Sequence, residues 1–275
     1  MKSHKLLAIV AVLGVLSIMV SDPIRQAYAA QPTPFVPPSV FQAAGPTADS
    51  IQGAVDEFRA ALGGIDNLNG AGQVSGRREI NWDGGGAATN TTGPETPFET
   101  FLNTRGARFT TKGAGLSQAT PAGLATLFKN TSYETIFSTF SPQRLFTPVG
   151  SNITEALFFV PGTAGATPAT VIGFGAVFTD VDESDGIGPR GRRANPRGDS
   201  TLMEYFDRDG TLIFSSFVPA SPGDGGLSFF GIVFEEARIA RVRITTGNVA
   251  PGPDDGEVDI VMMDDFIYAE PQPLH

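Results

Sequence analysis

The chain has 275 residues and a formal net charge of −10 at pH 7, with no cysteine and only two histidines, His4 and His275. Without cysteine it can form neither a disulfide nor a thiolate metal site, and its acidity disfavours nucleic acid and anionic membranes as partners. Because His4 falls within the export signal described next and His275 is the final residue, Ser-His-Asp catalysis and His-ligated zinc are excluded from the expected fold.

Residues 1–29 have the pattern of a secretory signal peptide. A basic start, "MKSHK", precedes an apolar core at 6–20, and the segment ends in the small-x-small pattern Ala27-Tyr28-Ala29. The core is short for a membrane span, which needs about 20 residues. We therefore predict cleavage after Ala29 and a secreted, extracellular protein with no membrane contact once the signal is removed.

Two short segments precede the main body of the chain. Residues 30–46 are rich in proline and predict an extended leader. In residues 47–64, Ile51, Val55 and Phe58 recur at helical spacing before a Gly-Gly pair, which predicts one amphipathic helix.

From residue 74 to residue 270 the pattern is that of β-strands. Short apolar runs rich in Phe, Val and Ile alternate with Gly, Pro, Asn and Asp, so we expect one mainly β domain, a jelly-roll-like antiparallel β-sandwich. The predicted strands are 77–82, 107–111, 144–147, 155–160, 170–180, 201–207, 211–218, 226–235, 238–246 and 258–268.

Three polar segments interrupt these runs. Residues 186–200 form an Arg-rich stretch that predicts a long solvated loop, whose role the sequence leaves open. The acidic segments 180–185 and 207–210 lack the full pattern of an EF-hand loop and are interpreted as turns, the second of them a hairpin turn.

The last predicted strand contains two adjacent aspartates, Asp264 and Asp265, within "VDIVMMDDFIY". Both faces of this strand are apolar, so at least one carboxylate is expected in the interior, where it needs a partner. Three partners remain open: backbone N–H groups at a β-bulge, an arginine of the preceding strand such as Arg241 or Arg243, or a calcium ion.

Several stretches resemble a group of bacterial secreted proteins, many of them exosortase-sorted PEP-CTERM surface proteins with predicted jelly-roll domains. The stretches lie at 76–84, 140–163, 173–182, 237–248 and 261–271. The resemblance implies an extracellular or cell-surface protein, mostly without an assigned activity. Because "AEPQPLH" ends where sorted members continue into an anchor, release from the cell is expected.

The resemblance also makes a structural calcium geometrically plausible, because jelly-roll binding modules often hold one between their first and last strands. Calcium prefers six to eight oxygen ligands and needs neither His nor Cys. Asp83 would come from the early strand and Asp264 or Asp265 from the late one. No cofactor is expected to be required.

The segment "EVDIVM" resembles the Glu-x-Asp-x-x-Glu strand of laminarinase-like glycoside hydrolases, which are also jelly rolls. Glu257 and Asp259 match the first two positions, but the acid/base position holds Met262, or Met263 with a bulge. Since methionine cannot donate a proton, no catalytic activity is expected.

Two functions remain open. One is a non-catalytic module that binds a glycan or surface polymer, for which Trp82, Tyr133 and Tyr205 are the candidate stacking residues. The other is a structural component of the envelope or extracellular matrix without a discrete ligand. The sequence determines neither the ligand nor the oligomeric state.

Overall fold

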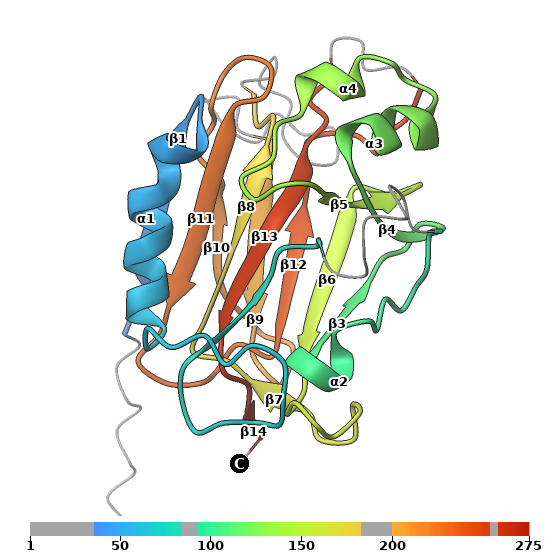
Figure 1. Ribbon diagram of the computed structural model, residues 1–275. Coiled ribbons are helices and arrows are strands. Elements are labelled where there is room, and N and C mark those ends of the chain that lie inside the picture. The colour runs from blue at the N-terminus through green and yellow to red at the C-terminus, as the bar shows by residue number, and fades with distance from the viewer. Residues whose placement is uncertain (1–35, 84–92, 183–199, 254–257, 275) are drawn as a thin grey trace, which may run out of the picture. The chain divides into compact units, whose positions relative to one another are not determined.

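The structure, a computed structural model, describes residues 36–83, 93–182, 200–253 and 258–274, all within one compact unit, Val36–His275 (Figure 1). The protein is mainly β, and its antiparallel sheets form a sandwich-like arrangement, as the sequence predicts. The predicted signal peptide, nearly all of the Arg-rich loop and Glu257 lie outside the described residues. Among the residues described, no helix is long and apolar enough to span a membrane.

The larger sheet has seven strands, in the order β1-β11-β8-β13-β5-β4, with β2 also pairing β13. Its strands are β1 Ser39–Gly45, β2 Arg77–Ile80, β4 Gly115–Ala119, β5 Leu145–Val149, β8 Gly173–Thr179, β11 Leu227–Val233 and β13 Met262–Ala269. Every residue of β8 and β13 is buried. These two strands therefore form the centre of the fold, which explains their nearly continuous apolar sequences.

The smaller sheet has five strands in the order β10-β9-β12-β6-β3. They are β3 Ala107–Thr110, β6 Ile153–Phe158, β9 Leu202–Phe206, β10 Leu212–Phe217 and β12 Arg241–Thr245. Burial alternates along β6, so one face packs inward and the other is partly exposed. Phe158 of β6 contacts Phe174 of β8 and Tyr268 of β13, and these rings join the two sheets.

Helix α1, Ala48–Ala61, lies within the predicted range and packs on β1 and β11. Its buried face consists of Ile51, Val55 and Phe58. The ring of Phe58 sits over Gly175 and Gly231, where a Cβ atom at either glycine would lie 2.9 Å from a ring carbon. The paired glycines of β8 and β11 thus make room for the helix.

The segment predicted as an extended leader, 30–46, differs from that expectation in its described part. Ser39–Gly45 forms strand β1 and pairs antiparallel with β11 along its whole length. "SVFQAAG" contains no proline, so all of its backbone N–H groups can take part in pairing. The prolines before it do not reveal that a strand follows.

The remaining elements are short. Helices α3, Pro121–Phe128, and α4, Tyr133–Ile136, cover a second apolar cluster at the β4–β5 end of the larger sheet. Helix α2, Leu102–Arg105, precedes β3, and a two-stranded pair joins β7, Ala169–Thr170, to β14, Gln272–Pro273. The predicted hairpin is present between β9 and β10, where Asp207 accepts hydrogen bonds from the amides of Asp209 and Thr211.

Candidate functional site

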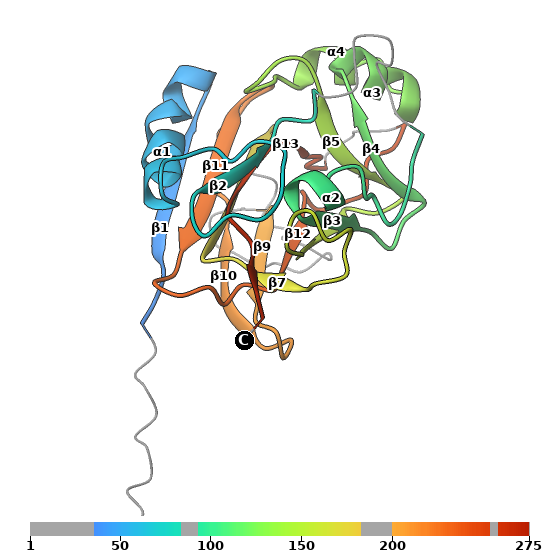
Figure 2. The ribbon, with the colours of Figure 1, turned by 60° about the horizontal axis from the view of Figure 1, so that its bottom comes forward.

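Strand β13 changes neighbours along one of its edges. It pairs with β8 on one side, while on the other it meets β5 at Met263 and β2 from Phe266 onward. Figure 2 shows β2 beside β13. A β-bulge lies between these two residues, because Met263 is opposite Phe178 and Phe266 is opposite Ala176. Asp264 and Asp265 are the bulge residues. On this edge of β13 they have no partner among the described strands, because pairing with β5 ends at Met263 and pairing with β2 begins at Phe266.

Trp82, which follows β2, binds this unpaired part of β13. Its indole N–H donates to the carbonyl oxygen of Asp264 at 2.9 Å, and its ring stacks on Phe146 with centroids 3.7 Å apart. The side chain is fully buried. The only tryptophan of the chain therefore satisfies a carbonyl that the bulge leaves without a strand partner.

The two aspartates bind the segment that enters β5. Asp264 Oδ2 accepts from the amide of Phe140 at 2.6 Å, and Asp265 Oδ1 accepts from the hydroxyl of Ser141, also at 2.6 Å. Burial raises the pKa of both carboxyls, and the charge of Asp265 raises the pKa of Asp264 further. The pair therefore binds protons more readily than ordinary aspartates.

Asp83 binds the backbone of the same segment. Its Oδ1 accepts from the amides of Gln143, at 2.5 Å, and Arg144, at 2.8 Å, whereas its buried Oδ2 has no hydrogen-bond partner among the described residues. Asp264 is therefore satisfied by a backbone N–H group, as one of the three alternatives expected, but the donor is Phe140 in the segment before β5 and not a residue of the bulge.

The other two partners considered for the buried aspartates are arginine and calcium. Arg241 and Arg243 lie on the smaller sheet, where both bind Glu155 at 2.7 Å, so the prediction that they pair with the buried aspartates is wrong. Arg59 of α1 lies 3.9 Å from Asp265. Within the described ranges, no group of three or more His, Cys, Asp or Glu side chains is arranged to hold a metal ion. Calcium at Asp83, Asp264 and Asp265 stays an alternative that a chelation experiment can test.

A cavity of about 360 Å³ opens beside Asp265. We call it the Asp265 pocket; it is lined by Arg59, Asp66, Leu68, Glu79, Asn81, Arg105, Ser141 and Asp265. These residues come from α1, from the loop before β2, from β2 and its end, from α2, from the segment before β5 and from β13. The pocket thus lies where β13 changes neighbours, and every lining residue except Leu68 has a polar side chain.

Arg59 and Glu79 form one wall of the pocket. The guanidinium binds the carboxylate through two nitrogens, Nε to Oε1 at 3.0 Å and Nη2 to Oε2 at 2.8 Å, and Arg77 binds the same carboxylate. Burial opposes ionisation of Glu79, but the hydrogen bonds and charges of the two arginines outweigh it and lower its pKa. This wall is therefore ionised, and its charges are already paired.

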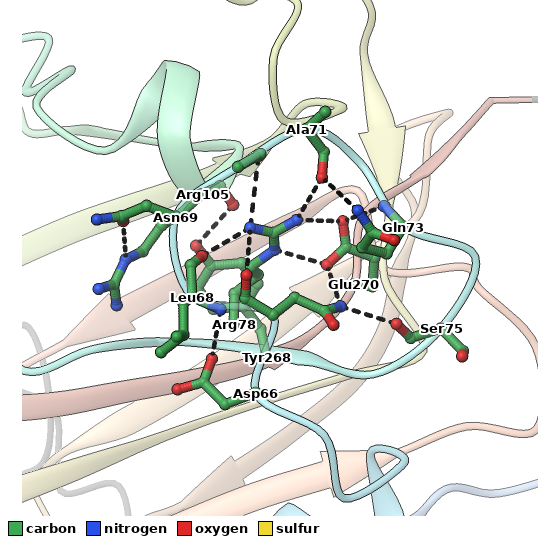
Figure 3. A network of polar contacts seen from close by, with 12 residues as sticks. Asp66, Leu68, Asn69, Ala71, Gln73, Ser75, Arg78, Arg105, Tyr268 and Glu270 are labelled. Atoms are coloured by element: carbon green, nitrogen blue, oxygen red, sulfur yellow. Dashed lines mark hydrogen bonds and ion pairs between the residues drawn. The ribbon is translucent and has the colours of Figure 1, made fainter.

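The loop at 66–75 forms a second wall, and a buried ion pair holds it in place (Figure 3). Arg78 binds both carboxylate oxygens of Glu270, at 2.6 and 2.8 Å, and neither side chain is accessible to solvent. Its remaining N–H groups donate to the carbonyls of Leu68, at 2.7 Å, and Ala71, at 3.0 Å. The backbone of the loop is thereby fixed from the core, which makes the pocket a preformed one.

Arg105, at the end of α2, completes the lining. Its Nε donates to Asn69 at 3.0 Å and its guanidinium lies 5.7 Å from the centroid of the Phe101 ring. The hydroxyl of Tyr268 donates to its carbonyl oxygen at 2.9 Å, which anchors the backbone (Figure 3). The chain turns sharply at Gly106, where φ is 71° and a Cβ atom would overlap the carbonyl of Phe159.

The residues proposed for sugar stacking lie elsewhere. Trp82, Tyr133 and Tyr205 each have 0% of their surface exposed. Their polar atoms bind inside the protein; for example, the Tyr205 hydroxyl donates to the carbonyl of Phe174 at 3.2 Å. In this structure the three rings belong to the core, so the exposed ring face that stacking requires is not present at these positions.

The glycosidase-like segment is also placed differently from the expectation. Strand β13 begins at Met262, so Asp259 precedes the strand rather than lying on one face of it. Asp259 is buried and bonded to the hydroxyl of Ser200. Burial, with the charges of Asp182 and Asp180, raises its pKa to about 8.

Sequence reasoning identified Asp265 but missed the other lining residues of the pocket. Their positions in the sequence show no common period, because they come from separate loops and helix ends. In comparisons with known proteins, no family model, curated protein or solved structure matches the chain.

Proposed function

We propose that the protein is a secreted, non-catalytic β-sandwich module, jelly-roll-like in its connectivity, that binds a glycan or similar polar surface polymer in the Asp265 pocket. The observation that carries the proposal is a cavity of about 360 Å³ in which hydrogen-bond donors and acceptors are fixed on several elements. Small-ligand sites typically occupy about 300–1,000 Å³. The export signal and the resemblance to secreted surface proteins support an extracellular ligand.

A sugar is a chemically suitable occupant. Each sugar hydroxyl can donate one hydrogen bond and accept others, and the lining offers carboxylates as acceptors beside guanidinium groups as donors. Asp265 Oδ2 lies 3.9 Å from Arg59, a distance longer than a hydrogen bond, so this oxygen can accept from a ligand. None of the lining residues is aromatic, so recognition would rest on hydrogen bonds rather than stacking.

The state of the pocket carboxylates supports binding rather than hydrolysis. A glycosidase needs two carboxyl groups free to act as acid and nucleophile or base. Glu79 is held by Arg59 and Arg77, and Asp265 is bonded to Ser141. Both are better suited to orienting a ligand than to attacking it.

A glycan array probed with the secreted protein tests the proposal. We expect saturable binding that free sugar competes away, and a loss of affinity of about tenfold in Asp265→Asn, which removes a carboxyl acceptor. The matched control is Glu99→Gln, because Glu99 forms an exposed pair with Arg108 outside the pocket. Concentration-dependent assembly without any sugar binding would instead favour a structural matrix component. Cleavage of the array glycans would show that the module is an enzyme.

A further inference from the structure

We infer that the ligand of the Asp265 pocket carries a carboxylate, as a uronic acid residue does, and that Arg105 binds this carboxylate. The inference rests on the proposed glycan-binding function and specifies its ligand. It follows from the pairing of charges around the pocket.

Arg105 is the pocket arginine whose charge is not paired by a carboxylate. In the part of the chain that the structure describes, no Asp or Glu oxygen lies within 4.0 Å of its guanidinium, and its one hydrogen bond to a side chain uses Nε. By contrast, Arg59 binds Glu79 through two nitrogens. The two Nη groups of Arg105 are therefore available at the pocket wall, in the parallel arrangement that binds a carboxylate through both oxygens.

The position of this guanidinium is set in advance. Asn69 holds Nε, the Phe101 ring lies beside the group, and Tyr268 anchors the backbone carbonyl. Asn69 itself belongs to the loop that Arg78 and Glu270 fix (Figure 3). Little side-chain entropy would then be lost when an anion binds, which is the condition under which a single arginine gives useful affinity.

The other charges in the pocket exclude simpler ligands. Asp66 and Asp265 line the same cavity as Arg105, so an anion without hydroxyl groups would leave these carboxyl acceptors without a donor. A metal cation or ammonium ion would face the unpaired charge of Arg105. A uronic acid residue matches both parts, because its carboxylate accepts from Arg105 while its hydroxyls donate to Asp265 and Asp66.

The net charge of the protein limits the number of acidic residues in the ligand. With a formal net charge of −10, the chain repels a densely charged polyanion at long range. A glycan in which single acidic residues are separated by neutral sugars avoids most of that repulsion. The inferred ligand is therefore a mixed neutral and acidic glycan.

The test compares two forms of the same ligand. Oligosaccharides with one glucuronic or galacturonic acid residue, and the same oligosaccharides after reduction of the carboxyl group to an alcohol, are titrated into the full secreted chain by calorimetry. We expect the acidic form to bind at least about tenfold more tightly, as for a charge-assisted pair. Arg105→Gln should reduce this preference to less than about twofold, because the acidic form loses its charged partner and the reduced form does not.

Arg108→Gln is the matched control, because Arg108 is paired with Glu99 and lies outside the pocket. Melting temperatures show that both variants are folded. Equal binding of acidic and reduced sugars would overturn the inference and leave the glycan-binding function standing, whereas no binding of either form would overturn the function itself. A preference that survives in Arg105→Gln, or competition by inorganic phosphate alone at equal affinity, would also overturn the inference.

Discussion

Arg78 and Glu270 form an ion pair from which solvent is excluded, with Nε 2.6 Å from Oε2 and both side chains almost completely buried. The pair joins β2 to the end of β13 and fixes the loop that walls the Asp265 pocket. A buried charge without its partner is much less stable than the intact pair. The stability of the fold and the shape of the pocket are therefore linked through these two residues.

Replacing Glu270 with Gln should lower the free energy of unfolding by about 3–5 kcal/mol, because Arg78 would remain buried without a counter-ion. Urea denaturation followed by circular dichroism measures the change. Glu99→Gln, which breaks the exposed pair with Arg108, should cost less than about 1 kcal/mol. Equal effects of the two substitutions would contradict the importance of the buried pair.

The packing of α1 gives a second prediction. Gly231→Ala should destabilise the protein by about 1–3 kcal/mol, since the new methyl group would meet the Phe58 ring at 2.9 Å. Gly53→Ala is the control in the same region: nothing lies within 4 Å of its Cβ position, and Ala is the better helix former. That variant should gain about 0.5–1 kcal/mol. Destabilisation by both substitutions would show that the packing of α1 is not the cause.

Stability should fall as pH rises from 5 to 8.5. The pKa of Asp259 is raised to about 8 from an ordinary value of 3.8, so the folded state holds the proton more tightly than the unfolded state. The contribution of Asp259 to the free energy of unfolding is fully present below pH 3.8 and is lost as pH rises toward 8. Asp264 and Asp265 act in the same direction. The pKa of Glu79 is lowered, so Glu79 changes the stability of the protein only at more acidic pH.

Scanning calorimetry across this range should show the melting temperature falling by about 5 °C. Asp259→Asn should reduce the fall and melt above the native protein at pH 8.5. Asp209→Asn, in the exposed hairpin turn, should leave the pH profile unchanged. A melting temperature that rises between pH 5 and 8.5 would contradict the prediction.

Calcium should not alter the stability of the protein. Of the carboxylate oxygens proposed as ligands, Asp83 Oδ1 and Asp264 Oδ2 accept from backbone amides and Asp265 Oδ1 from Ser141, which leaves few of the six to eight oxygens that calcium prefers. We expect equal melting temperatures in EDTA and in millimolar calcium. A rise with calcium that Asp264→Asn abolishes would instead support a site at Asp83, Asp264 and Asp265.

Export should remove the first 29 residues. The intact mass of the secreted protein is expected to correspond to a chain that begins at Ala30, because the small-x-small pattern ends at Ala29. Replacing Ala29 with a bulky residue should slow the cleavage. Full-length protein recovered from the membrane fraction would contradict both processing and release.

The sequence by itself determined the mainly β character of the fold, the helix within 47–64 and the absence of disulfide and thiolate chemistry. Alternation along a strand and 3.6-residue spacing along a helix are local properties, and the absence of a residue type does not depend on folding. The burial of Asp264 also followed from local pattern, because apolar residues flank it on both faces of β13.

Only the tertiary structure decided where β1 pairs, where Trp82 lies and which residues line the pocket. The edge strand Ser39–Gly45 forms because β11 pairs with it. Trp82 is buried where the partner of β13 changes from β5 to β2. Arg59, Arg105 and Asp265 line one pocket because the fold brings distant segments together. Contacts between distant segments produce no periodic pattern of residues within any one segment. The periodicity of a segment reports only whether that segment forms a helix or a strand.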